Sequence, residues 1–423
     1  MPSPSARTRT LAAAASLLVT GMLLTGCAVG TQVATGSTAS TAASSTDATA
    51  ASAASAASDA TTTSETIAET TAAVEAFLAT LTDEQRDAVL YDYDDETKTT
   101  SWSNFPLTFV ERAGLNLNDL SEEQRAAAME VLASLLSEEA YETVTGIMGG
   151  DAYLLEHSSS TETSLGQYTI ALFGDASETE AYEVQFGGHH LGINATLDGA
   201  AGEITFAPTH LGVQPAVYTD AEGTEVQPFD GIYTDAFAFF DSLTTEQQAT
   251  LTSGAVSMCA PGDTCDFATG TGLTGAELTE AQRELLLELI ANWAGMADAE
   301  TMEAALAKIE ATLDDTVIAW SGETVYDMSQ GDGISFSISG PNVYVALQAQ
   351  QGSAGADVSG VSTSGWGHVH TIYRDPTNDY ANSVEQQAAT GMGGGAAAGA
   401  PGGGAPADGG MPEGGPEGDD AAA

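Results

Sequence analysis

One short phrase occurs four times in this chain and limits the fold more than any other feature. Its copies span residues 81–86, 120–125, 243–248 and 278–283, and each contains Ser/Thr-x-x-Gln after a leucine. In this pattern the hydroxyl caps the first turn of a helix while the glutamine reaches back to the capping residue, and the leucine suits a hydrophobic staple. Each phrase therefore predicts the start of a helix.

Two of these phrases open a long amphipathic helix. Apolar residues follow the caps Ser121 and Thr279 at the same offsets: Ala128, Val131, Leu132 and Leu135 in one case, and Leu286, Leu289, Ile290 and Trp293 in the other. This i, i+3, i+4, i+7 spacing is typical of a helix with one buried face. A short helix and a long helix are thus predicted as a pair, twice.

A β-rich stretch follows each predicted helix pair. Strand signals cover residues 167–173, 182–206, 316–320, 333–348 and 368–373. Segment 182–194 aligns with segment 334–346 without a gap, and both read strand, glycine-containing turn, strand. We predict an α+β fold of two similar halves, each a helix pair followed by a small antiparallel sheet, forming one domain. The alternative is that the phrases recur only because helices need caps.

The first residues carry an export signal. Residues 1–26 combine Arg7 and Arg9 with an apolar run and small residues, which is typical of a secretory signal peptide. The ending Leu-Thr-Gly-Cys resembles the bacterial lipobox, which implies cleavage before Cys27 and lipidation of its thiol. Two acyl chains suffice for stable attachment to a membrane. We expect a lipoprotein anchored outside the cytoplasm to the bacterial cell membrane; the alternative is an ordinary signal with a chance cysteine.

Low-complexity segments bound the folded region. Residues 27–63 are rich in Ala, Ser and Thr and predict a disordered tether, and residues 388–423 are a Gly/Pro/Ala-rich tail that we also expect to be disordered. The folded domain is therefore expected at 64–387, with halves of about 64–222 and 223–387.

The charge balance excludes one class of partner. The chain has 60 acidic and 9 basic residues, for a formal charge of −51. Such a field repels nucleic acid, so nucleic-acid binding is excluded. The sequence also lacks a Gly-x-Ser-x-Gly elbow, a His-Glu-x-x-His helix, a phosphate-binding loop and a dinucleotide fingerprint. It therefore supports none of the common enzyme classes with local motifs, and whether the protein is an enzyme stays open.

Two cysteines flank a Pro-Gly turn in Cys-Ala-Pro-Gly-Asp-Thr-Cys. Outside the cytoplasm this arrangement predicts a disulfide between Cys259 and Cys265. The chain-entropy stabilisation for so short a loop is roughly 2 kcal/mol.

Histidines supply the candidate metal ligands. His368 and His370 share one face of a predicted strand, about 7 Å apart. Together with His189 or His190 they make three imidazoles, and His210 or Asp375 completes a set suited to zinc, copper or iron. The adjacent His189 and His190 are expected to face opposite sides, so that only one points into a site. Any of these histidines can instead be a hydrogen-bonded structural residue.

A second candidate site surrounds Arg374. This arginine stands beside Asp375 and Asp379 near a predicted turn, and Trp102 and Asn104 are candidates for the wall of the same cleft. Arg374 can bind a carboxylate or phosphate in bidentate fashion, or it can be held in a structural fork by the aspartates. The aromatic residues can equally belong to the core.

Three unusual strings resemble, in order, the bacterial domain of unknown function 3500. They are Trp102-Ser103-Asn104-Phe105-Pro106, Phe186-Gly187-Gly188-His189-His190-Leu191 and Tyr373-Arg374-Asp375-Pro376-Thr377-Asn378-Asp379-Tyr380. The resemblance covers about residues 70–385 and implies a secreted or lipid-anchored protein. It implies no particular activity.

Three functions follow as hypotheses. The first is an exported protein that binds a transition metal, zinc or copper, through the histidines. The second is a non-catalytic cell-surface module in which the Arg374 region grips a small ligand or a cell-wall component. The third is an extracytoplasmic hydrolase that uses Asp375 or Asp379 as general base.

Overall fold

Ten strands follow one another across a twelve-stranded sheet in the order β1-β3-β4-β5-β7-β14-β13-β12-β11-β10, with β2 added beside β3 and β6 beside β5. This computed structural model describes residues 61–159, 164–252, 256–262, 267, 272–351 and 358–385. Neighbouring strands are antiparallel except for β1 and β3. The strands are β1 Leu90–Tyr91, β2 Leu115–Asn116, β3 Thr169–Phe173, β4 Ala181–Gly187, β5 Leu191–Asp198, β6 Glu203–Thr205, β7 Thr209–Val213, β10 Leu273–Thr274, β11 Val317–Gly322, β12 Ile334–Gly340, β13 Val343–Gln350 and β14 Gly365–Arg374, with β8 Tyr218–Thr219 and β9 Glu225–Val226 forming a separate ribbon.

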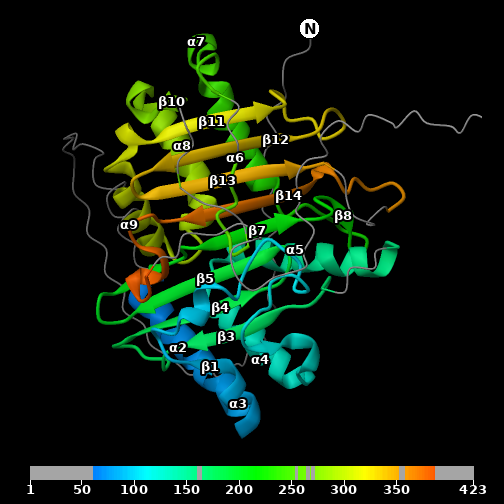
Figure 1. Ribbon diagram of the computed structural model, residues 1–423, viewed down its shortest axis with the longest axis vertical. Coiled ribbons are helices and arrows are strands. Elements are labelled where there is room, and N and C mark those ends of the chain that lie inside the picture. Colours follow the sequence, from blue (N-terminus) through cyan, green and yellow to red (C-terminus); the bar gives the residue numbers. More distant parts are fainter. Residues whose placement is uncertain are drawn as a thin grey trace, which may run out of the picture. The chain divides into compact units, whose positions relative to one another are not determined.

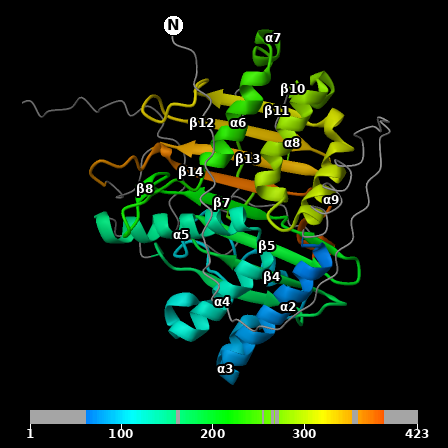
Figure 2. The same ribbon diagram turned by 180° about the vertical axis from the view of Figure 1, so that it is seen from behind.

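Helices cover one face of this sheet, as the two opposite views show (Figures 1 and 2). The described residues contain the α-helices α2 Thr63–Thr80, α3 Asp83–Val89, α4 Glu122–Leu135, α5 Glu138–His157, α6 Asp230–Ser242, α7 Thr245–Gln248, α8 Glu280–Ala294 and α9 Ala299–Glu310. Short 3-10 helices are η1 Glu96–Thr99, η2 Leu117–Asp119, η3 Gly275–Glu277, η4 Leu313–Asp315 and η5 Asp379–Asn382. The described chain is therefore a mixed α/β fold with a mostly antiparallel sheet.

The four capping phrases begin helices as predicted. Complete capping boxes stand at the starts of α3, α4, α7 and α8, where the capping residues are Thr82, Ser121, Thr244 and Thr279. The predicted apolar faces of α4 and α8 are buried. The capping glutamines also meet across helices, since Gln124 donates to Gln85 at 2.8 Å and Gln282 donates to Gln247 at 2.9 Å. The sequence did not predict these two contacts between helices.

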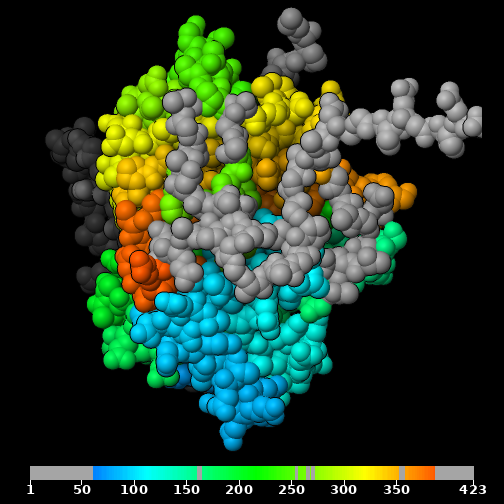
Figure 3. All heavy atoms as spheres, viewed as in Figure 1, coloured from blue at the N-terminus to red at the C-terminus, as the bar shows by residue number. Residues whose placement is uncertain are grey.

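The main core lies between the helices and the sheet. On β14, Thr371 accepts a hydrogen bond from the indole of Trp293 on α8 at 2.8 Å. A smaller core cluster covers the opposite face, the one turned toward the viewer in Figure 3, and there Trp102 and Cys259 gather with Ile372 of β14. Side chains of β14 alternate between these two environments. The even-numbered residues from 368 to 374 consequently lie on the face away from the helices.

Most of the predicted strands are present, and the sheet is continuous through the middle of the chain. Strands β7 and β14 pair with Leu211 opposite Thr371 and His210 opposite Ile372, which joins the strands that precede α6 to those that follow it. The predicted signal peptide, nearly all of the predicted tether and the predicted tail lie outside the described residues. Among the helices that the structure describes, none has the length and hydrophobicity needed to cross a bilayer.

Candidate metal centre

Five of the six histidines meet near the centre of the sheet. His368 and His370 come from β14, and His210 comes from the neighbouring strand β7. His189 and His190 lie in the turn that joins β4 to β5. The turn reaches this place because β5 pairs with β7, with Gly192 opposite His210.

Two glycines, one in the turn and one on β7, allow close packing around this group. A Cβ atom on Gly212 would stand 3.4 Å from both the His190 and the His210 rings and 3.0 Å from the carbonyl oxygen of Val369. A Cβ atom on Gly188 would stand 2.6 Å from the carbonyl oxygen of Gln167. Larger residues at these two positions would push the turn away from the strands.

The imidazoles stand close enough to share one ion. Donor nitrogens of His189, His190 and His370 lie within 4.8 Å of one another. At zinc–nitrogen distances of 2.0–2.1 Å, tetrahedral ligands are about 3.3 Å apart, so binding requires the nitrogens to approach by at most about 1.5 Å. The His368 and His370 Nε2 atoms are 2.9 Å apart, which brings a fourth imidazole to the group. His189 and His190 stack with ring centres 4.2 Å apart, so the expectation that they face opposite sides does not hold in this turn.

Several ring nitrogens of this group are buried without a partner. Among the described residues, no hydrogen bond reaches Nδ1 of His189, Nε2 of His190, or Nδ1 of His368 and His370. An unsatisfied buried polar atom costs about 1–3 kcal/mol. Four such atoms close together are unusual in a packed interior, and a metal ion could pair with those that carry a lone pair.

Burial favours the neutral form of four of these histidines by lowering their pKa values. It lowers the pKa of His368 to about 3 and that of His210 to about 4. It also lowers the pKa of His189 and of His370 well below the usual 6.5, and the neighbouring imidazoles add to the effect. A neutral imidazole has the free lone pair that a metal needs.

Helix α5 supplies a carboxylate that the sequence analysis missed. Asp151 is fully buried, and its Oδ1 lies 2.5 Å from Nδ1 of His190. Its other oxygen accepts a hydrogen bond from the Tyr168 hydroxyl at 2.8 Å. A signal was present: Asp151 continues the buried stripe of Val144 and Ile147 at helical spacing, where an acid is unexpected.

His210 belongs to the cluster but faces away from the group of possible ligands. Its Nδ1 lies 2.7 Å from the carbonyl oxygen of Thr371, and its Nε2 lies 3.2 Å from that of His189. Both ring nitrogens therefore face backbone oxygens, which favours a structural role over metal ligation. The sixth histidine, His157, lies at the exposed end of α5.

Arg112 fixes the turn that carries the histidines. Its guanidinium donates to the carbonyl oxygens of Gly188, Ser103 and Phe105 at 2.7–2.8 Å and to that of Val110. Burial lowers the pKa of Arg112 to about 9, so the side chain stays cationic at neutral pH. The covering segment around Ser103 and the turn before His189 are thus held by one side chain.

The Arg374 region is built as an internal network. The Arg374 Nε atom donates to Asp379 at 2.7 Å, and its Nη1 atom donates to the carbonyl oxygen of Cys259. Trp102 lies beneath the guanidinium and donates to Tyr380 at 2.8 Å. These contacts favour a structural role for Arg374, held by Asp379, over the binding of a ligand.

The remaining predicted residues have these positions. Asp375 pairs with Lys308 at 2.7 Å, away from the histidines that could share an ion. Asn104 is buried, and its Oδ1 has no hydrogen-bond partner among the described residues. Cys259 is disulfide-bonded, whereas its predicted partner Cys265 and the predicted lipidation site Cys27 lie outside the described residues.

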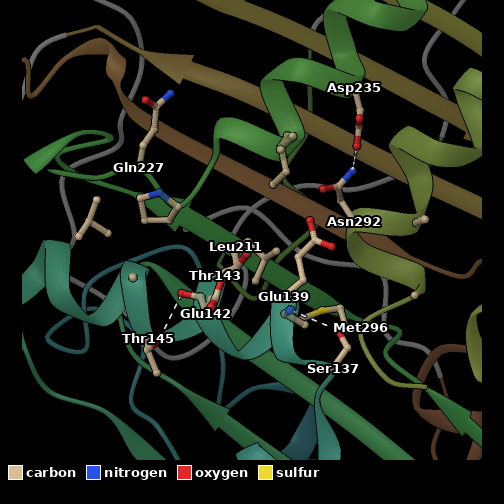
Figure 4. A pocket seen from close by; sticks show the side chains of 18 of the residues that line it. Ser137, Glu139, Glu142, Thr143, Thr145, Leu211, Gln227, Asp235, Asn292 and Met296 are labelled. Atoms are coloured by element: carbon tan, nitrogen blue, oxygen red, sulfur yellow. Dashed lines mark hydrogen bonds between the residues drawn. The ribbon is translucent and has the colours of Figure 1, made fainter. Parts of the chain in front are cut away.

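A separate cavity of about 750 Å³ opens on the helical side, between α5, α6, α8 and the β8–β9 ribbon. Figure 4 shows Glu139 and Glu142 of α5 on one wall and Asp235 of α6 on another, with Leu211 of β7 at its floor. Asp235 accepts a hydrogen bond from Asn292 at 2.8 Å. The cavity wall carries six carboxylates, from Glu139, Glu142, Asp220, Glu225, Asp235 and Glu288, and no basic side chain among its described lining residues.

Comparisons with known proteins identify the family. No curated protein and no solved structure matches the chain. The sequence model of the family described as "Protein of unknown function (DUF3500)" matches residues 63–382, which include the histidine cluster, Asp151 and Arg374. The chain belongs to the DUF3500 family.

Proposed function

We propose that this protein binds a single transition-metal ion, zinc or copper, through His190, His370 and His189, with His368 beside them. The supporting observation is the group of three imidazoles whose donor nitrogens lie within 4.8 Å of one another, while several ring nitrogens nearby lack partners among the described residues. Imidazole nitrogens suit zinc and copper better than calcium or magnesium, which prefer oxygen ligands. A bound ion would satisfy those buried nitrogens that ligate it.

The first test is the metal content of the purified protein after dialysis against a weak chelator. The proposal expects close to one zinc or copper per chain, and its loss in the His190→Ala/His370→Ala variant. His157→Ala removes an exposed histidine of α5 and serves as the matched control. Equal metal content in the wild type and the double variant would overturn the proposal, as would a wild type that neither retains nor takes up either metal.

We also infer that the protein acts outside the cytoplasm while anchored to a membrane through Cys27. The support is the sequence of the first 27 residues, with its charged start, apolar run and lipobox. Mass spectrometry of the protein from its native membrane fraction tests this. A diacylated Cys27 as the new N-terminus supports the anchor, and an unprocessed chain contradicts it.

An internal duplication is part of this proposal. Two series of elements follow the same order along the chain: β2, η2, α4, α5, β3, β4 and β5 come before β7, and β10, η3, α8, α9, β11, β12 and β13 come before β14. They differ in β6, which follows β5, and in η4, which follows α9. The glutamine contacts also recur, because Gln124 donates to the carbonyl oxygen of Thr80 and Gln282 to that of Ser242, each residue lying two positions before a cap. The histidine turn occurs in only one of the two halves.

The cavity on the helical side favours a second function, the binding of a small cationic ligand. Its carboxylates and its volume suit an organic amine. Titration calorimetry with a diamine such as putrescine tests this function. Saturable binding supports this function if the Glu139→Gln/Asp235→Asn variant abolishes it. Heats that do not saturate and change only with ionic strength contradict it.

A further inference from the structure

Tyr168 and Asp151 form a chain of buried hydrogen bonds that ends on His190. The Tyr168 hydroxyl donates to Asp151 Oδ2 at 2.8 Å, and Asp151 Oδ1 lies 2.5 Å from His190 Nδ1. Tyr168 is 3% exposed, and the other two residues are fully buried. This arrangement lies inside the fold, so solvent does not compete for these hydrogen bonds.

The position of the proton on His190 follows from this contact. A carboxylate only accepts hydrogen bonds, so the His190 atom that faces it, Nδ1, must carry the hydrogen. In the neutral ring, the other nitrogen, Nε2, is then a bare lone pair, and it is one of the atoms without a partner among the described residues. The carboxylate also adds electron density to the ring, which raises the basicity of Nε2 as a ligand.

Three separate elements converge to make this arrangement. Asp151 lies on α5, Tyr168 directly precedes β3, and His190 lies in the β4–β5 turn. The Tyr168 ring stacks on Phe186 of β4 with ring centres 5.9 Å apart, which fixes the direction of the hydroxyl. The apolar stripe of α5 would accept a leucine at position 151 without disturbing the helix. The buried carboxylate of Asp151 faces a single imidazole, and so we infer that it has a role beyond packing.

We propose that Asp151, oriented by Tyr168, is a positioning residue that holds His190 as the Nδ1–H tautomer and presents its Nε2 to a zinc or copper ion. This inference deepens the proposed metal binding and rests on it for the identity of the ligand. The tautomer itself is a property of the metal-free protein. It can therefore be measured whether or not a metal binds.

The test begins with the metal-free protein. Long-range ¹⁵N–¹H NMR of labelled histidine is expected to show His190 with the hydrogen on Nδ1 and a bare Nε2. In Asp151→Asn the preference is expected to weaken, because the amide can donate to Nδ1 as well as accept from it. A wild-type His190 protonated on Nε2 overturns the positioning role, and so does a tautomer that Asp151→Asn leaves unchanged.

Metal affinity supplies the second readout, by competition with a chromophoric chelator. We expect Asp151→Asn to weaken zinc binding by about 10- to 100-fold, the usual cost of losing such a partner, and Tyr168→Phe to weaken it less. Asp298→Asn removes a carboxylate that accepts hydrogen bonds from Thr63, Thr66 and Thr301, and Tyr182→Phe removes a buried hydroxyl bonded to Thr71. These two controls are expected to lower stability without changing zinc affinity.

The outcomes separate the two proposals. A wild type that binds neither metal while His190 keeps its Nδ1–H tautomer overturns metal binding and leaves the positioning by Asp151 supported. Zinc affinity that falls equally in Asp151→Asn and Asp298→Asn indicates a general loss of structure and overturns the positioning role.

Discussion

Two hairpins of the sheet share the pattern of strand, glycine-containing turn and strand, but their turns differ. Segments 182–194 and 334–346 align without a gap, so that His189 and His190 of the β4–β5 turn correspond to Pro341 and Asn342 of the β12–β13 turn. In the second turn, the Asn342 side chain donates to the carbonyl oxygen of Lys308 at 3.1 Å and accepts from Thr377 at 3.1 Å. Both polar groups of the Asn342 side chain therefore have a partner near the surface.

The first turn is organised in the opposite way. It is buried against β7 and β14, an arginine holds its backbone, and its imidazole nitrogens are only partly satisfied. Leaving polar atoms unpaired in the interior lowers stability. As the β12–β13 hairpin shows, such a hairpin needs only a turn that satisfies its own hydrogen bonds. The β4–β5 hairpin does not need the histidines in order to fold, and so we infer that they serve a function.

Exchanging the residues of the two turns should have the largest effect. His190→Asn puts the second turn's residue into the first, and we expect zinc affinity to fall by more than about 100-fold, since even the loss of a ligand's partner costs about 10- to 100-fold. The reciprocal Asn342→His should create no binding, because no other described histidine lies in that turn or its two strands. Zinc titration of both variants checks this. A gain of binding in Asn342→His would show that one imidazole in such a turn is enough.

The contacts that hold the two turns should contribute different amounts to the free energy of unfolding. Arg112→Ala leaves four carbonyl oxygens without their charged donor, so the free energy of unfolding should fall by about 3 kcal/mol or more. Asn342→Ala removes two ordinary hydrogen bonds and should cost about 1 kcal/mol. Urea unfolding of metal-free protein measures both. Equal costs would contradict the conclusion that the first turn is the one held by the interior.

Metal should stabilise the protein only through the imidazoles of the first turn and of β14. At a free zinc concentration 100 times the dissociation constant, binding adds about 2.7 kcal/mol to the free energy of unfolding. The gain should disappear in His370→Ala and persist in Asn342→Ala. Denaturant titrations with and without zinc test this, and a similar gain in all three proteins would indicate unspecific binding to surface carboxylates.

The helix caps should show the smallest effects, and they test how alike the two halves are. Gln124→Ala and Gln282→Ala each remove one arm of a capping box together with the contact to the other glutamine. Each should lower the free energy of unfolding by about 1 kcal/mol. Thermal unfolding of the two variants measures the costs. Costs that differ severalfold would argue against equivalent roles in the two halves.

Local features of the fold were predictable from the sequence. The Ser/Thr-x-x-Gln phrases and the apolar spacing of α4 and α8 depend on residues within a few turns of one another, and the structure confirms them. The face shared by His368 and His370 follows from strand alternation alone. Their convergence with the β4–β5 turn depends on the pairing of two distant strands, β7 and β14, which the sequence analysis did not predict.

The contacts that complete the site depend on long-range packing. Asp151 reaches His190 across 39 residues of sequence, and Arg112 reaches Gly188 across 76. The strand-alternation rule also failed for His189 and His190, because these residues lie in the turn after β4 rather than within a strand. A buried acid in the apolar stripe of α5 was the one local sign of the missing partner.

X-ray absorption spectroscopy of the zinc-loaded protein tests whether the imidazoles of the first turn and of β14 bind one ion. We predict nitrogen ligands at 2.0–2.1 Å with the outer-shell scattering of at least three imidazole rings, and a loss of this pattern in His190→Asn/His370→Ala. A first shell of carboxylate oxygens, or an imidazole pattern that the double variant leaves intact, would contradict a metal centre at these histidines.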